Sequence, residues 1–254
     1  MRYTLKHILK KNDKEKVKVP EIFVIYVAQV VFRDLIKFSK AGFSHADVKP
    51  GNIFVDPDNI VFLGDYGLLS RDYRPDETSE KMAITGTIAY LSPERLQDLS
   101  PEVLIAEVDN YITEKSKLYQ SVTCVVIAPK VFGQKGDIWA VGVILLEIMA
   151  GRHPFDKTSL STEELITKII NAEINVREMV KDRGYSMELV IFVEKCLQVG
   201  IDETGEPTRW GYAEIEKSEV FSNKVDELVG NSHLKNKELD KVINELTKGI
   251  NKIL

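Results

Sequence analysis

Apolar residues recur at helical spacing through much of this chain. Between residues 20 and 40 a subset of them recurs near the helical period, which predicts a long helix with a buried face. These positions are Phe23, Val27, Val30, Val31, Leu35 and Phe38. Pro20 suits the first turn of that helix and Gly42 its end, because proline has no N–H to lose there and glycine readily takes a left-handed conformation. Further helices are expected over residues 5–11, 137–150, 162–171 and 186–197.

Two short runs have the composition of β-strands instead. Residues 53–55 and 60–63 are apolar, and the residues between them, Asp56-Pro57-Asp58-Asn59, favour a turn. The chain is therefore expected to fold as a mainly α protein, α+β overall, with one small β-hairpin.

The last part of the chain predicts one more helix. Its apolar positions repeat at intervals of three or four residues, with Lys and Glu between them, as expected for an amphipathic helix. These positions are Leu239, Val242, Ile243, Leu246, Ile250 and Ile253. Packing of this helix against the rest of the chain is favoured over a role in binding a partner.

Candidate chemistry lies just before the hairpin, in the segment His45-Ala46-Asp47-Val48-Lys49-Pro50-Gly51-Asn52. Asp47 and Asn52 are five residues apart, so one loop can aim a carboxylate at a hydroxyl nucleophile while an amide oxygen ligates Mg²⁺. Lys49 is free to meet a phosphate. The spacing indicates phosphoryl transfer.

Further motifs follow in a fixed order. They are Asp65-Tyr66-Gly67, the segment from Gly86 to Glu94, and the segment from Asp137 to Gly142. Matches in this order are hard to obtain by chance. The sequence resembles the eukaryotic-type (Hanks-type) Ser/Thr protein kinase family over about residues 1–221.

The resemblance implies chemical roles for five residues. Asp47 would be the catalytic base, Lys49 would steady the γ-phosphate of ATP, and Thr87 would help to seat the substrate beside Asp47. Asn52 and Asp65 would hold Mg²⁺. The implied cofactors are ATP and Mg²⁺, and the implied substrate is a Ser or Thr hydroxyl of a protein.

Four other residues match supporting positions. Glu94 and Arg209 match a buried ion pair, and Asp137 matches a helix-start aspartate that braces the backbone of the catalytic loop. His45 is interpreted as a core histidine that braces the same loop.

The chain also departs from the family pattern. Its first glycine is Gly42, so the Gly-rich loop, the strand lysine and the rest of the N-lobe are missing, and residues 1–221 are expected to be a C-lobe that starts at the hinge. An insertion is expected at about 97–133, and residues 222–254 form the helical extension. Ala46 stands where the family usually has arginine, and Tyr66 where it usually has phenylalanine.

Three functions remain open. The chain is the catalytic part of a Ser/Thr protein kinase, a non-catalytic pseudokinase-like binding module, or one half of a two-chain kinase whose N-lobe is a separate polypeptide. An exposed apolar patch near Tyr3, Leu5, Ile53 and Phe54 would favour the two-chain form.

Composition and charge exclude several classes of partner and location. The net charge of −5 over 254 residues gives no basic surface for nucleic acid. The longest apolar runs, 22–32 and 138–150, are too short to span a bilayer, and the polar start is unlike a signal peptide. The two cysteines and four histidines are dispersed, which argues against a disulfide scaffold or a zinc site. A cytoplasmic protein that binds neither nucleic acid nor membrane is expected.

Overall fold

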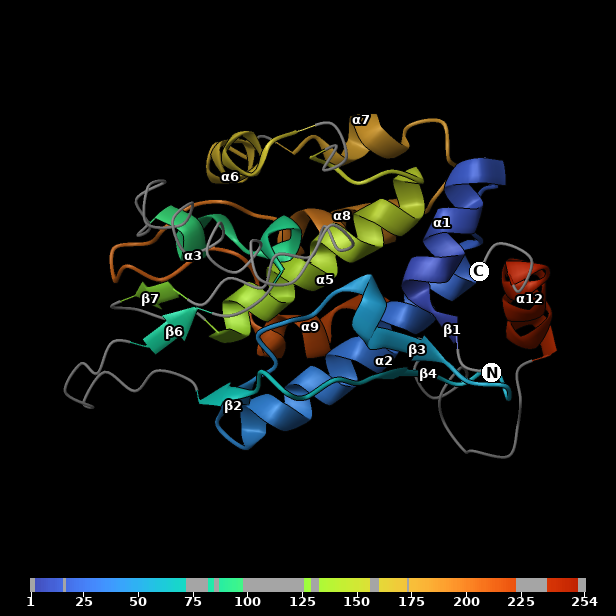
Figure 1. The fold of residues 1–254 in the computed structure, drawn as a ribbon, viewed down its shortest axis with the longest axis horizontal. Helices are drawn as coiled ribbons and strands as arrows, with labels where there is room; N and C mark the ends of the chain where they lie inside the picture. Colours follow the sequence, from blue (N-terminus) through green and yellow to red (C-terminus); the bar gives the residue numbers. More distant parts are fainter. Residues whose placement is uncertain are drawn as a thin grey trace, which may run out of the picture.

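The structure is a computed structural model that describes residues 3–15, 17–71, 82–84, 87–97, 126–128, 133–155, 160–172, 174–222 and 237–250. Helices form most of the described body, and short antiparallel strands lie along one side of it (Figure 1). The mainly helical prediction is therefore confirmed. Within the described residues, no helix combines the length and apolar character needed to cross a bilayer.

The predicted helices form with small changes at their ends. The first is α1 (Leu5–Glu15), which is four residues longer than expected, and α5 (Gly133–Ala150) begins four residues early. The other three are α2 (Glu21–Lys40), α6 (Thr162–Ile170) and α8 (Met187–Cys196). The structure adds short helices that were not predicted: α3 (Pro93–Gln97), α7 (Val176–Val180), α9 (Tyr212–Lys217) and α10 (Glu219–Ser222).

The core is built around α5. This helix is apolar on nearly all sides, and a helix of that kind must be buried. It packs against α2 and α8, and its Trp139 side chain is completely buried. Because α5 is buried along most of its length, the core fixes the position of side chains near its start, such as Asp137.

A three-stranded antiparallel sheet holds the predicted hairpin. Strands β3 (Ile53–Val55) and β4 (Val61–Leu63) pair with Phe54 opposite Phe62, and Asn59 in the turn has a φ of 64°. The hairpin is confirmed, although β4 begins at Val61. A strand that was not predicted, β1 (Tyr3–Thr4), joins the other edge of β3.

Two further strand pairs are short. Strand β2 (Phe43–Ser44) pairs with β5 (Ser70–Arg71), and β6 (Met82–Ile84) pairs with β7 (Val126–Ala128). The last strand lies within the expected insertion. Residues 98–125 and 129–132 of the insertion lie outside the described residues.

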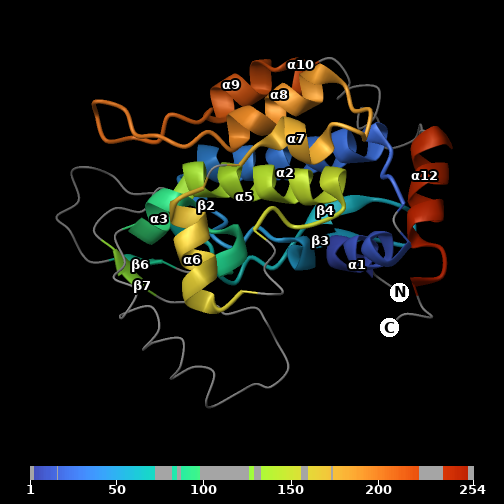
Figure 2. The ribbon, with the colours of Figure 1, turned by 90° about the horizontal axis from the view of Figure 1, so that it is seen from above.

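The C-terminal helix α12 (Lys237–Thr247) lies beside α1 at one edge of the molecule (Figure 2). It also contacts α2, and its apolar side chains Leu239, Ile243 and Leu246 are buried. The Nζ of Lys11 donates to the carbonyl oxygen of Glu245 at 2.9 Å. The helix therefore packs against the body, as favoured from the sequence. The domain boundary at residue 222 remains a prediction.

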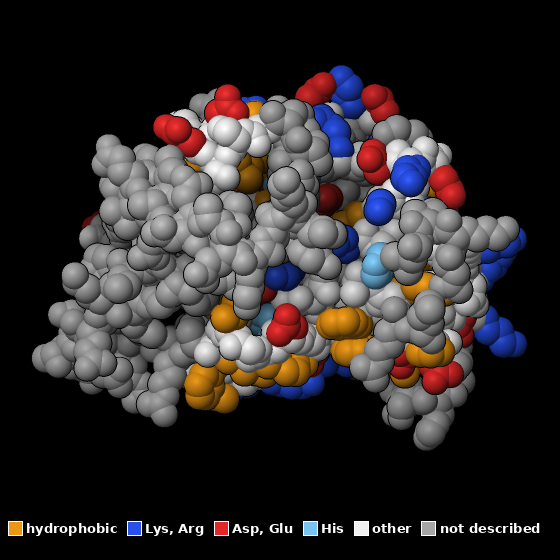
Figure 3. Space-filling view, in the orientation of Figure 1, with side chains coloured by type: hydrophobic (Ala, Val, Ile, Leu, Met, Phe, Trp, Pro, Cys, Tyr) orange, Lys and Arg blue, Asp and Glu red, His pale blue; other side chains and the backbone are white. Residues whose placement is uncertain are grey.

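The surface has an apolar edge. Figure 3 shows apolar side chains gathered below the middle of the face, in the region of β2, β4 and α2. Exposed apolar residues of this part of the chain are Ile60, Tyr66 and Leu69.

Candidate active site

The segment 45–52 is anchored by the start of α5. The backbone N–H of His45 donates to Asp137 Oδ2 at 2.7 Å, and that of Ala46 donates to Asp137 Oδ1 at 3.0 Å. Ala46 has a φ of 67°, a left-handed conformation that costs free energy for alanine. Asp137 is only 1% exposed. Both oxygens of one buried carboxylate therefore hold the loop in a conformation that its own sequence does not favour.

His45 connects this loop to the segment after the hairpin. It is completely buried, its Nδ1 accepts a hydrogen bond from the Asp47 N–H at 3.3 Å, and its Nε2 lies 3.2 Å from the Gly64 carbonyl oxygen. With Nδ1 as acceptor, Nε2 carries the proton and donates to Gly64. Burial lowers the pKa of His45, although the bond to Gly64 and the Asp47 carboxylate act in the opposite direction. The ring is therefore neutral at neutral pH.

Asp47 is the centre of a compact polar cluster. Its Oδ1 accepts from the Thr87 hydroxyl at 2.9 Å, and its Oδ2 accepts from Lys49 Nζ at 2.6 Å and from Asn52 Nδ2 at 3.2 Å. Lys49 Nζ also donates to Thr87 Oγ1 at 3.1 Å. The Asp47 side chain is 5% exposed and the Lys49 side chain 19%. The structure thus brings four of the five predicted chemical residues into direct contact.

The fifth, Asp65, lies close by but apart from this cluster. The backbone N–H of Gly64 donates to the Asn52 carbonyl oxygen at 2.9 Å, which ties the residue before Asp65 to the end of the loop. Asp65 has a φ of 60° and an exposed side chain. Among the described residues, its carboxylate has no hydrogen-bond or ion-pair partner.

Asn52 and Asp65 fit a Mg²⁺ ion by the chemistry of their donor atoms. The amide nitrogen of Asn52 donates to the carbonyl oxygen of Asp47 at 2.9 Å as well as to its carboxylate, so its amide orientation is fixed. Its Oδ1 is left without a hydrogen bond among the described residues. Mg²⁺ prefers oxygen ligands, and one or two protein groups with phosphate and water oxygens suffice. The described residues contain no cluster of three or more His, Cys, Asp or Glu suited to a metal.

Tyr66 packs beneath the loop. Its hydroxyl donates to the Leu63 carbonyl oxygen at 2.5 Å, and its ring contacts the rings of Phe38 and His45 at centroid distances of 5.3 and 5.9 Å. The tyrosine hydroxyl thus has a backbone partner, and the aromatic packing fixes His45 from a second side.

Glu94 and Arg209 form a buried bidentate ion pair. The Nη1 and Nη2 atoms of Arg209 donate to Glu94 Oε1 at 2.5 Å and Oε2 at 2.7 Å. Arg209 also donates to the Lys135 carbonyl oxygen at 3.0 Å and lies 5.0 Å from the centre of the Trp139 ring. The pair therefore joins α3 and α5 to the segment before α9.

Sequence reasoning missed a second buried contact below this region. The Tyr90 hydroxyl donates to Glu147 Oε2 at 2.8 Å. Burial and the Glu147 carboxylate raise the pKa of Tyr90 well above its ordinary value. The available signal was the single glutamate in the apolar run of α5, because a buried carboxylate needs a donor.

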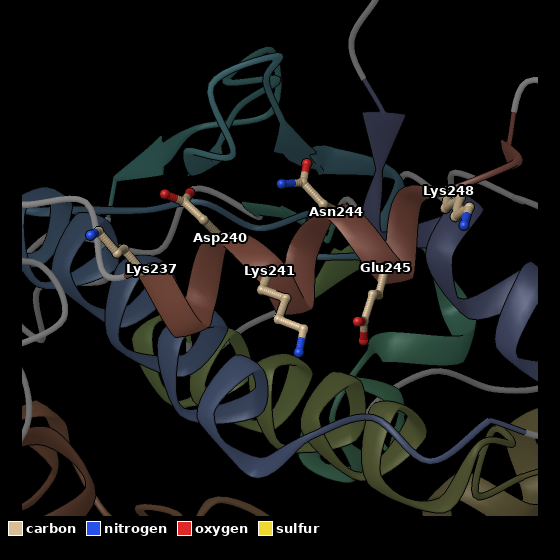
Figure 4. Close-up of a pocket in the computed structure, with 6 residues that line it drawn as sticks. All are labelled: Lys237, Asp240, Lys241, Asn244, Glu245 and Lys248. Atoms are coloured by element: carbon tan, nitrogen blue, oxygen red, sulfur yellow. The ribbon is translucent and has the colours of Figure 1, made fainter.

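An open hollow runs along α12 (Figure 4). In this view Asp240 and Asn244 point to one side of the helix and Lys241 and Glu245 to the other. Asn59 Nδ2 donates to Asp240 Oδ1 at 3.2 Å and lies 3.3 Å from Asn244 Oδ1. None of the six lining residues belongs to the predicted site, so the hollow has no part in it. The full lining is Lys237, Asp240, Lys241, Asn244, Glu245 and Lys248.

Comparison with known proteins agrees with the arrangement of residues around Asp47. Residues 1–113 match the model of the protein kinase domain. The Ser/Thr-protein kinase Nek9 of Mus musculus is 31% identical over 190 residues, which cover 73% of this chain and 15% of that protein. Human Nek2 is 29% identical over 170 residues, 65% of this chain and 30% of that protein.

An Aurora kinase of Candida glabrata is 28% identical over 136 residues, 54% of this chain and 28% of that protein. This chain thus spans less than a third of the length of each of these relatives. The matches support a protein kinase family for this chain and relate it to Ser/Thr kinases.

Proposed function

We propose that this chain carries the catalytic C-lobe of a Ser/Thr protein kinase, which transfers the γ-phosphoryl group of ATP to a protein Ser or Thr hydroxyl. One observation carries the proposal: Asp47 is held by Lys49, Asn52 and Thr87 at the same time. A loop that only supported the fold would not need a cation, an amide and a hydroxyl on one carboxylate.

Asp47 acts as the base. Its Oδ1 already accepts the Thr87 hydroxyl at 2.9 Å, so a substrate hydroxyl that enters beside Thr87 meets the same carboxylate. A base must lie within hydrogen-bond reach of the proton it takes. Asp47 orients the nucleophile and receives its proton at Oδ1 as the phosphoryl group moves.

Lys49 and the two metal-binding candidates serve the phosphate. Lys49 Nζ is shared between Asp47 and Thr87, so its charge lies beside the position of the nucleophile. Asn52 Oδ1 and the Asp65 carboxylate would hold Mg²⁺. When bound, the ion neutralises charge on the phosphate oxygens, which is a main source of catalysis in this reaction.

Activity of this chain alone is expected to be weak. The residues before Gly42 include no glycine, so they cannot form a Gly-rich strand pair over the phosphates. ATP would then be held mainly by the metal and Lys49, without a loop that covers its phosphates. Its γ-phosphate would be poorly aligned. Poor alignment lowers the rate strongly even where the reacting groups are present.

The two-chain alternative receives limited support from the surface. Leu5 and Ile53 are at most 1% exposed, so they cannot form the exposed apolar patch expected for that alternative. Tyr3 and Phe54 are only partly exposed. The binding-module alternative makes a different prediction, that replacing Asp47 leaves function unchanged.

The test is Mg²⁺-dependent phosphate transfer from labelled ATP to Ser/Thr peptides by the purified protein. Asp47→Asn and Asp65→Asn should each remove the activity. The matched control is Asp182→Asn, which removes the charge of an exposed aspartate just after α7 and should leave activity unchanged. Transfer that survives Asp47→Asn would contradict the proposed function.

A further inference from the structure

Buried charges gather beneath the catalytic loop. Asp137 and Glu94 are 1% and 7% exposed, and a buried carboxylate is costly unless positive charge and hydrogen bonds compensate it. Glu94 has the guanidinium of Arg209 across both of its oxygens. Asp137 uses both oxygens on backbone N–H groups of the loop, which carry no net charge.

Arg95 lies next to this carboxylate. Arg95 follows Glu94 in α3 and is 3% exposed. Its side chain packs against Gly136, the residue before Asp137. A Cβ atom at Gly136 would lie 2.8 Å from Arg95 Cδ and 3.3 Å from Arg95 Nη1. The absence of a side chain at residue 136 therefore lets the guanidinium lie against the first turn of α5.

The charge of Arg95 interacts with three carboxylates. Burial lowers the pKa of Arg95, and the carboxylates of Asp137, Glu94 and Asp47 act in the opposite direction. Arginine stays protonated in proteins, so a fixed positive charge lies among these three acids. Ala46, between His45 and Asp47 in the loop, contributes only a methyl group.

We propose that Arg95 is a positioning residue for the catalytic loop. Its guanidinium balances the Asp137 carboxylate, which holds the N–H groups of His45 and Ala46 and thereby keeps Asp47 in place. Without that charge, Asp137 is a buried anion with weakened compensation and holds the loop less firmly. Ala46 then relaxes from its left-handed conformation, and Asp47 moves with it. The catalytic consequence rests on the proposed function, whereas the structural consequence does not.

The first test measures amide hydrogen exchange at His45 and Ala46 by NMR. Arg95→Met keeps the length of the side chain and removes its charge, and Arg95→Lys keeps the charge. We expect Arg95→Met to speed exchange at these two amides by about tenfold or more, with the amides of α8 unchanged. Arg95→Lys should stay close to the wild type. Unchanged exchange in Arg95→Met, or an equal loss in Arg95→Lys, would show that Arg95 only fills space.

A second pair of variants applies if Arg95→Met does not fold. Gly136→Ala pushes the Arg95 side chain away without removing its charge. Gly142→Ala, on the same helix, creates a clash of similar severity, with Cβ 2.9 Å from Cys196 Cβ and Leu197 Cδ2, far from Arg95 in sequence. Only Gly136→Ala should speed exchange at His45 and Ala46 selectively. An equal effect of both variants would overturn the proposal.

The kinetic test separates the two proposals. Arg95→Met should lower kcat roughly tenfold or more while KM for ATP changes little, because Asp47 and not the nucleotide site is displaced. Arg95→Lys should recover most of the rate. Phosphate transfer that survives Asp47→Asn would overturn the proposed function and leave the exchange result to decide the role of Arg95.

Discussion

Lys49 Nζ lies 2.6 Å from Asp47 Oδ2, with both side chains largely buried. Only Val48 separates them in sequence, whereas Thr87, which bonds to both groups, lies 40 positions after Asp47. The pair itself is therefore local, and its two bonds to Thr87 tie the loop to a distant segment.

Replacing Lys49 should impair phosphate transfer more than folding. Lys49→Met removes the cation beside Asp47, and we expect kcat to fall about 100-fold because charge stabilisation at the phosphate is lost. The free energy of unfolding should change by about 1.5 kcal/mol, because the Asp47 carboxylate keeps its hydrogen bonds from Asn52 and Thr87. Steady-state kinetics and urea unfolding measure the two effects. Comparable loss in Lys37→Met, an exposed lysine on α2, would show that the effect is unspecific.

Asp137→Ala should destabilise the protein strongly. It leaves the backbone N–H groups of His45 and Ala46 buried without an acceptor, at about 1–3 kcal/mol each. Urea unfolding should therefore show a loss of about 2–5 kcal/mol. Asp34→Asn, at an exposed ion pair, should change the unfolding free energy by about 0.5 kcal/mol or less. A small effect of Asp137→Ala would mean that water replaces the carboxylate.

The Glu94–Arg209 pair should show strong coupling. Glu94→Gln or Arg209→Met leaves one buried charge uncompensated, and each should cost about 3–5 kcal/mol of unfolding free energy. The double variant should cost much less than the sum, because both charges are then gone. A double-mutant cycle by urea unfolding measures the coupling. Additive effects would indicate that the two side chains act independently.

Helix α12 should contribute to the stability of the whole body. Ile243 is completely buried, so Ile243→Ala should lower the unfolding free energy by about 2–4 kcal/mol. Lys241→Ala, at an exposed position on the same helix, is the matched control and should have an effect of about 0.5 kcal/mol or less. Urea unfolding followed by circular dichroism measures both effects. If Ile243→Ala lowers the helical content but leaves the main unfolding transition unchanged, α12 unfolds separately from the body.

Stability should fall in mild acid because of His45. Burial lowers the pKa of its folded form below the ordinary value of 6.5, so the unfolded chain binds the proton more tightly. The stability present above about pH 6.5 is then lost as the pH falls through that value toward the lower folded pKa. Unfolding measured between pH 7.5 and 5 in about half-unit steps tests this, and His45→Gln should flatten the slope.

His7 provides the comparison for that experiment. Partial burial and the charges of Lys6 and Lys10 lower the pKa of His7 as well. The pH dependence assigned to His45 must therefore persist in His7→Gln. If His7→Gln flattens the slope as much as His45→Gln does, the assignment to His45 is wrong.

The sequence by itself determined the parts of this protein that depend on neighbouring residues. The long helices follow from apolar periodicity, and the hairpin follows from two apolar runs around a turn. The grouping of Asp47, Lys49 and Asn52 follows from their spacing within one loop. These features are local, so pattern and spacing were enough to predict them.

Tertiary structure decided the rest. It joined β1 to β3, fixed α12 through Lys11, and gave Ala46 a conformation that alanine does not favour. It also placed Arg95 and Asp137, which are 42 residues apart, beside one loop. No local pattern encodes such contacts, because their free energy depends on which buried charges and donors meet once the core around α5 has formed.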